Sequence, residues 1–226
     1  MGRILFLVIV LGKCRADSDF SSYLCTSFYI IMDKRRLAVF ASGNGTNCEN
    51  LIRYFRNSDV AEVALVVSNR SEAGVLQRAA QLGCPSVVIK KQALTADEGV
   101  MDLMREYNIH FIVLAGFLPI IPDYLIEAYP NRIINIHPSL LPKFGGHGMW
   151  GHHVHEAVWA AKESETGMTV HYVSSVCDGG QIISQYAVPL LPTDTPDDIA
   201  RKEHELEMKY FPLVVERLVR DINVLF

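Results

Sequence analysis

From Leu37 onward, short apolar runs alternate with stretches of helical spacing, and this alternation constrains the fold more than any other feature of the sequence. We expect strands at residues 37–41, 61–67, 86–89, 111–115 and 133–137. We expect helices between them, at residues 47–56, 73–82, 96–107 and 123–128. Buried strands that alternate with helices are typical of βαβ units, which build a parallel sheet covered by helices on both faces.

The pattern changes in the last third of the chain. A helix is expected at residues 154–161, followed by two strands, 168–173 and 182–188, whose spacing across a turn favours antiparallel pairing. Thr195 and Pro196 open a final amphipathic helix, which we expect to be broken or kinked near Pro212. The sequence therefore predicts one α/β domain with a Rossmann-like open twisted sheet, parallel in its N-terminal half and antiparallel toward the C-terminus.

The first 33 residues differ from the rest. Arg3 precedes an apolar run at residues 4–11, which has the shape of a short signal peptide but is too short to span a bilayer. A disordered or loosely docked extension with Met32 as the working start, a secretory signal, and an added structural element are the three interpretations. We expect residues 1–33 to be a poorly defined extension and residues 34–226 to be the functional domain.

Charge and cysteine usage exclude several classes of protein. The formal net charge is −4, so the chain as a whole lacks the excess of positive charge that is typical of proteins that bind nucleic acid or anionic membranes. The chain has five cysteines, an odd number, and no two of them have C-x-x-C spacing. We therefore expect neither a disulfide framework nor a zinc site. A reducing, cytoplasmic setting fits this usage best.

A glycine-containing motif, residues 42–47 (Ser-Gly-Asn-Gly-Thr-Asn), follows the first predicted strand and opens the first predicted helix. Glycines let the backbone approach a ligand, and the free N–H groups at a helix start favour a phosphate. A dinucleotide fingerprint would need a third glycine where Cys48 stands and an acidic residue at the end of the second strand. The motif therefore indicates a monophosphate site, or else a plain turn capped by Thr46 or Asn47.

The segment 135–142 (Asn-Ile-His-Pro-Ser-Leu-Leu-Pro) brings an amide and an imidazole together. Asn135 and His137 are two residues apart in a predicted strand, so their side chains share one face at the strand's carboxyl end. An amide can donate to an oxyanion, and histidine exchanges protons near neutrality. The pair suits stabilisation of a tetrahedral intermediate, although a lone histidine before a proline turn is more often structural.

Two further features are ambiguous from the residues alone. Asp178-Gly179-Gly180 is ordinary turn chemistry, or a turn that holds a carboxylate against His137 and keeps the imidazole charged. Four histidines gather further along, but their spacing does not match a helical zinc pair, so we expect a solvated rim near the site and no metal. These histidines are His147, His152, His153 and His155.

Together, the three motifs resemble the signature of the folate-dependent formyltransferases, over about residues 37–220. The loop at residues 42–47 narrows the resemblance to the branch that formylates 5-phosphoribosylglycinamide in purine synthesis. The resemblance implies a transferase that uses 10-formyltetrahydrofolate as co-substrate, with no metal and no covalent intermediate. It also implies a monomer or homodimer that acts on small molecules, not on nucleic acid or membranes.

The resemblance assigns roles to matching positions. Asn135 would hydrogen-bond the formyl oxygen, His137 would stabilise the oxyanion and act as general acid, and Asp178 would raise the pKa of His137 and help to move the proton. Phosphate or ribose, glycinamide, and pterin would each contact a separate set of residues. These sets are Gly45, Thr46 and Asn47 for phosphate or ribose, Glu207 for glycinamide, and Leu118, Pro119, Ile120, Ile121 and Asn135 for the folate.

The sequence also departs from the family. The loop at residues 144–151 is longer than the common form, Pro119 stands where a basic or polar residue is frequent, and Met208 replaces a histidine. Contacts to the folate tail are therefore left open. A formyltetrahydrofolate hydrolase, another folate formyltransferase, and an inactive folate- or nucleotide-binding module are the alternatives, and the phosphate loop and intact trio argue against them.

Overall fold

The computed structural model describes residues 34–221, which form one mixed sheet of seven strands in the order β3-β2-β1-β4-β5-β6-β7. Strands β1 to β5 pair in parallel, whereas β6 pairs antiparallel with β5 and with β7. The predicted fold class, including the antiparallel strands near the C-terminus, is confirmed. The strands are β1 Arg35–Phe40, β2 Ala61–Ser68, β3 Ser86–Val88, β4 Phe111–Ala115, β5 Ile133–His137, β6 Glu165–Tyr172 and β7 Ile182–Pro189.

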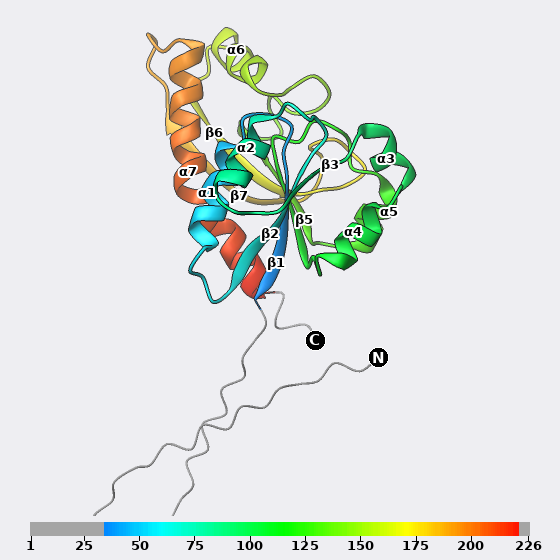
Figure 1. Cartoon of the computed structure of the whole chain (residues 1–226). Coiled ribbons are helices and arrows are strands. Elements are labelled where there is room, and N and C mark those ends of the chain that lie inside the picture. The colour runs from blue at the N-terminus through cyan, green and yellow to red at the C-terminus, as the bar shows by residue number, and fades with distance from the viewer. Residues whose placement is uncertain (1–33, 222–226) are drawn as a thin grey trace, which may run out of the picture. The chain divides into compact units, whose positions relative to one another are not determined.

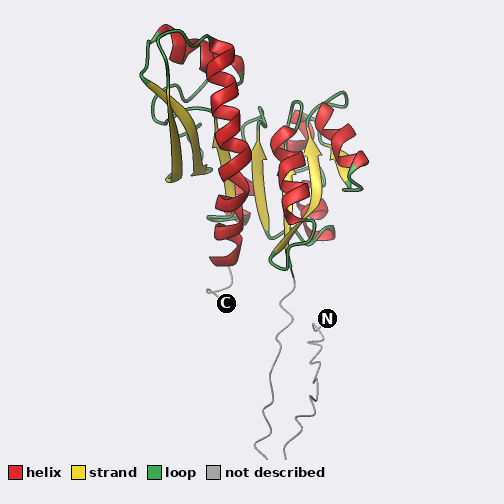
Figure 2. Ribbon diagram, turned by 90° about the vertical axis from the view of Figure 1, so that its left-hand side faces the viewer, coloured by secondary structure: helices red, strands yellow, loops and turns green. Residues whose placement is uncertain are grey.

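Helices cover both faces of this sheet, and the long helix α7 runs beside α1 along one of them (Figures 1 and 2). The central strand β1 packs in both directions. Leu37 and Val39 join a core with residues of α1, α2 and α7, while Ala38 and Phe40 join a core with α3, α4 and α5. The helices are α1 Thr46–Phe55, α2 Gly74–Gln81, α3 Lys91–Ala96, α4 Val100–Glu106, α5 Asp123–Ala128, α6 His152–Ala160 and α7 Pro196–Asp221.

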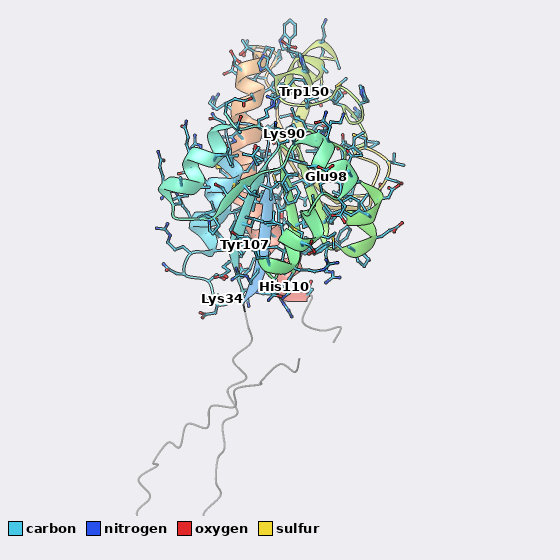
Figure 3. The ribbon with its side chains drawn as sticks, turned by 45° about the vertical axis from the view of Figure 1, so that its right-hand side comes forward. Lys34, Lys90, Glu98, Tyr107, His110 and Trp150 are labelled. Atoms are coloured by element: carbon cyan, nitrogen blue, oxygen red, sulfur yellow. The ribbon has the colours of Figure 1, made fainter. Side chains whose placement is uncertain are left out.

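The sheet order changes direction between β1 and β4, and this switch point lies at the carboxyl ends of the parallel strands. Open α/β sheets bind their ligands in the crevice formed there. Lys34 and His110, which precede β1 and β4, lie at the opposite end of the molecule from Trp150, which follows β5 (Figure 3). The backbone N–H of Leu118 donates to Ser42 Oγ at 2.9 Å, which links the two loops beside the switch point.

Two helices differ from the prediction. The helix expected at residues 96–107 starts only at Val100, because Asp97 and Gly99 have left-handed backbone conformations. A separate helix, α3, precedes it and had not been expected. Of the break or kink expected near Pro212 in the last helix, the break is absent: the segment is helical throughout, and Phe211 and Pro212 are both buried. Tertiary packing there outweighs the local cost of proline.

The predicted extension at residues 1–33 and its apolar runs lie outside the described residues, as do residues 222–226. None of the helices within residues 34–221 combines the length and apolar character needed to cross a membrane. Cys48, Cys84 and Cys177 are free thiols.

Candidate active site

Asn135 and His137 project from the last residues of β5, at the carboxyl edge of the sheet. The strand is held centrally between β4 and β6, so its end is fixed in position. His137 is 3% exposed, whereas Asn135 is half-buried and lines an open cleft. The two side chains that were predicted to share a face therefore do so in a rigid setting.

Asp178 lies in the turn between β6 and β7, and its carboxylate lies at the end of β5. Its Oδ2 atom is 3.5 Å from Nδ1 of His137, and its Oδ1 atom is 3.5 Å from Nδ2 of Asn135. The backbone N–H of Gly146 donates to Oδ2 at 2.9 Å, which anchors the carboxylate. Burial raises the pKa of Asp178, but its contacts with His171, His137 and Gly146 outweigh burial and leave that pKa below its ordinary value.

His171 is a buried neighbour of this trio that the sequence reasoning missed. Its Nε2 atom is 3.1 Å from Asn135 Nδ2 and 3.5 Å from Asp178 Oδ1. Its Nδ1 atom lies 2.9 Å from the Tyr172 carbonyl oxygen and so carries the hydrogen, which leaves Nε2 to accept from Asn135. The antiparallel register pairs Asn135 of β5 with His171 of β6, and the sequence analysis did not predict that these two strands are neighbours.

The environment of His137 differs from expectation in one respect. Burial lowers its pKa below the ordinary histidine value, and this outweighs the opposite effects of Asp178 and of the Phe144 carbonyl. Asp178 thus acts to raise the pKa of His137, but this effect is smaller than the opposite effect of burial. The tighter contact of the ring is between Nε2 and the Phe144 carbonyl oxygen, at 2.8 Å.

An open cleft lies at the carboxyl end of β5, beside Asn135. All five residues predicted to contact the folate line it, together with His171 and Asp178. They are Leu118, Pro119, Ile120, Ile121 and Asn135. Ile120 is 69% exposed in the described structure, so the cleft offers an apolar wall to a flat ligand.

The predicted acceptor residues gather where α1 begins. Gly45 is the N-cap of α1, in a left-handed conformation and without a side-chain cap, so neither Thr46 nor Asn47 serves as the cap. Asn47 Nδ2 donates to Glu207 Oε2 at 2.8 Å, across 160 residues of sequence. The charge of Glu207 also raises the pKa of His137, as the smallest of the effects on that ring.

Three buried polar atoms near Glu207 have no hydrogen-bond partner within the described chain. They are Asn47 Oδ1, His155 Nδ1 and Glu203 Oε1. Buried polar atoms in native proteins are normally paired, and exceptions require an explanation. Two of the three are acceptors only, so the cluster suits a ligand rich in N–H and O–H groups.

The four histidines do not behave as one group. His152 and His153 are exposed on α6, but His155 is 7% exposed and burial lowers its pKa. The expected solvated rim is therefore wrong for His155, because the turn of α6 points it inward beside Val154. Among residues 34–221, no group of three or more histidine, cysteine, aspartate or glutamate side chains is arranged to hold a metal ion.

The chain is similar to known proteins over most of its length. The sequence profile of the formyl transferase family matches residues 35–215. The chain is 35% identical over 197 residues to phosphoribosylglycinamide formyltransferase, chloroplastic, of Arabidopsis thaliana, covering 83% of this chain and 68% of that protein. It is 35% identical over 190 residues to phosphoribosylglycinamide formyltransferase of Bacillus subtilis (strain 168), covering 82% of this chain and 95% of that protein. Other relatives are longer: the chain spans 63% of a second plant protein and 13% of a trifunctional purine biosynthetic protein.

Solved structures give the same result. The crystal structure of phosphoribosylglycinamide formyltransferase from Anaplasma phagocytophilum is similar, with a TM-score of 0.76 and 34% sequence identity. The match covers 84% of this chain and 88% of that one. Profile, sequence and fold therefore agree over most of the described residues, and the chain belongs to the formyl transferase family.

Proposed function

We propose that this chain transfers the formyl group of 10-formyltetrahydrofolate to the amine of 5-phosphoribosylglycinamide, a step of purine biosynthesis. The observation that carries the proposal is the convergence of Asn135, His137 and Asp178 at one strand end, between an apolar cleft and a cluster of hydrogen-bond acceptors. We assign the reaction to the domain at residues 34–226 and place it in the cytoplasm.

The substrates supply the reacting atoms, so the protein has to align them and manage charge. The amine nitrogen attacks the formyl carbon and forms a new C–N bond. The bond from that carbon to N10 of the folate then breaks, and the proton lost by the amine is delivered to N10. Alignment and stabilisation of the oxyanion account for most of the rate that such a site can provide.

Asn135 is the donor best situated for the developing oxyanion. Its amide carries two N–H groups: one donates to His171 Nε2, and the other has only the long 3.5 Å contact with Asp178 Oδ1. A contact of that length is close to the limit of a hydrogen bond and is easily exchanged for a better acceptor. The second N–H of Asn135 therefore turns to the oxyanion, and His171 fixes the amide plane.

His137 has one committed and one available ring nitrogen. Nε2 is held at 2.8 Å by the Phe144 carbonyl, so it carries a hydrogen in either charge state. Nδ1 gains its hydrogen only in the imidazolium, and it faces Asp178 Oδ2 at 3.5 Å. We assign proton exchange during the reaction to Nδ1, with Asp178 stabilising the cation that forms there.

The acceptor is held by the start of α1 and by Glu207. The uncapped N–H groups after Gly45 favour the phosphate, because the N-terminus of a helix is electropositive. Glu207, oriented by Asn47 and by His204 Nδ1 at 3.2 Å, accepts from the glycinamide N–H groups. Glu207→Gln is therefore expected to raise the KM for the acceptor roughly ten- to hundredfold. Glu205→Gln, on the exposed face of α7, is the matched control.

The proposal is tested by formyl transfer with the full chain, measured with and without 5-phosphoribosylglycinamide. We expect turnover that requires the acceptor and yields the formylated product. Release of formate at a comparable rate without acceptor would identify a hydrolase instead. Binding of both ligands without turnover would identify an inactive binding module.

A further inference from the structure

Glu203 is a buried acid to which the proposed chemical steps assign no individual role. It is 3% exposed on α7, and its Oε1 atom has no hydrogen-bond partner among the described residues. Ile199, Glu203 and Glu207 are each four residues apart, so they lie on one face of the helix. That face runs from the small core around Ile199, where α6 packs, to the acceptor site. Glu203 thus lies directly behind Glu207.

The carboxyl groups of Glu203 and Glu207 are in hydrogen-bond contact. Two buried carboxylates that touch cannot both be charged at low cost. Glu207 has two donors, Asn47 and His204, that stabilise its negative charge, whereas burial and the charge of Glu207 both raise the pKa of Glu203. Burial and the charge of Glu207 therefore both favour the protonated form of Glu203.

Charged and titratable neighbours of the pair come from several elements. His204 of α7 contacts Glu207, and the charge of Glu207 also acts on His155 of α6 and on His137 of β5. From α1 the facing group is the neutral Asn47. From β7, Tyr186 stacks on Tyr210, almost one turn beyond Glu207. In this setting it is Glu207 whose charge acts on Glu203.

We propose that Glu203 is a positioning residue: as a neutral carboxylic acid it donates a hydrogen bond to Glu207 and fixes that carboxylate for the amine-bearing end of the acceptor. This inference rests on the proposed function, because it assigns Glu207 to the acceptor. It also sets the charge of the subsite at −1. A charge of −2 would stabilise the acceptor's ammonium form, whereas attack on the formyl carbon requires the neutral amine.

Two variants separate hydrogen bonding from packing. Glu203→Gln keeps the shape and a donor, so we expect the KM for 5-phosphoribosylglycinamide at neutral pH to stay within about twofold of wild type. Glu203→Leu removes the donor, so we expect that KM to rise about tenfold while kcat changes little. Glu205→Gln, on the exposed side of the same helix, is the control and should match wild type.

The pH dependence gives a signature that a structural role would not produce. As the pH rises, wild-type Glu203 loses its proton, Glu207 loses a donor, and the KM for the acceptor should rise. The amide introduced by Glu203→Gln does not titrate, so the KM of this variant should lack the alkaline rise. A parallel rise in wild type and in Glu203→Gln would overturn the proposal.

An infrared difference spectrum at neutral pH, wild type minus Glu203→Gln, provides a readout that requires no substrate and no Leu variant. We expect the C=O stretch of a protonated carboxylic acid in wild type and its loss in Glu203→Gln. Persistence of that band in the variant overturns the assignment. Acceptor-dependent transfer with an unchanged KM in a folded Glu203→Leu overturns the role of Glu203 alone. Absence of transfer in wild type overturns the proposed function, whatever the infrared result.

Discussion

Nδ1 of His137 lies 3.5 Å from Oδ2 of Asp178, and both side chains are nearly enclosed, at 4% and 11% exposed. The relationship joins the end of a central strand to a turn 41 residues later in the sequence, and Gly146 anchors the carboxylate from a third segment. Water screens the interaction of Asp178 with the imidazolium poorly in such a setting, so the loss of Asp178 should strongly destabilise the charged form of His137.

Removal of either partner should therefore abolish most of the activity. We expect His137→Ala and Asp178→Asn each to lower kcat by about 10²- to 10⁴-fold, the usual contribution of a positioned proton-transfer group. Steady-state formyl transfer at saturating substrates measures this. His153→Ala and Asp197→Asn change exposed residues of the same types and should retain wild-type turnover. Wild-type turnover in either site variant would contradict the mechanism.

The pKa of His137 should fall when either of its two acidic neighbours is neutralised, and it should fall further for Asp178 than for Glu207. Burial already lowers this pKa, while Asp178 raises it more strongly than Glu207 does. Asp178→Asn removes an anion that stabilises the imidazolium, so the pKa should fall further below its wild-type value. Glu207→Gln should lower it by less. NMR titration of the ring C–H signals, assigned with His137→Ala, measures both shifts, and a rise in Asp178→Asn would refute the account.

Much of the fold was predictable, because the burial of β1 and β4 on both faces appears in the sequence as continuous apolar runs such as Phe111–Ala115. The boundaries of the helices were less predictable. The start of α4 depends on Gly99 in a left-handed conformation, and the spacing of Val100, Leu103 and Met104 does not reveal where the first turn begins.

The candidate site was predictable in part, for a related reason. Strand periodicity predicted that Asn135 and His137 share a face. The sequence around Asp178 predicted only a turn, and the family resemblance alone linked Asp178 to the other two residues. Glu203 was missed because an acid at a helical position normally indicates an exposed face. Its burial results from the packing of α7 against α1, α6 and the sheet, and this depends on contacts distant in sequence.

Gly45 should be far less tolerant of substitution than its neighbour Gly43. Gly45 has a φ of 79°, and an added Cβ would lie 2.5 Å from the Cβ of Val75. Strain and overpacking together should lower the free energy of unfolding by about 2–5 kcal/mol in Gly45→Ala. At Gly43 an added Cβ meets nothing within 4 Å, so Gly43→Ala should change it by less than about 0.5 kcal/mol. Urea unfolding midpoints compare the two, and equal losses would be the contrary result.

The raised pKa of Glu203 should make stability depend on pH in a direction that can be derived. In the unfolded chain this group ionises above its ordinary value of 4.5, whereas the folded chain retains the proton to higher pH. The unfolded state therefore releases a proton first, so the free energy of unfolding falls as the pH rises from 4.5 toward the folded-state pKa.

Glu203→Gln removes that linkage, because the amide does not titrate. Its free energy of unfolding, relative to wild type, should rise with pH over this range by up to about 1.4 kcal/mol per pH unit. Glu205→Gln is exposed and should show no comparable slope. Urea unfolding at several pH values above 4.5 measures the difference. A wild type that gains stability over Glu203→Gln as the pH rises would show that Glu203 is ionised in the fold, since only a stabilised carboxylate would reverse the sign.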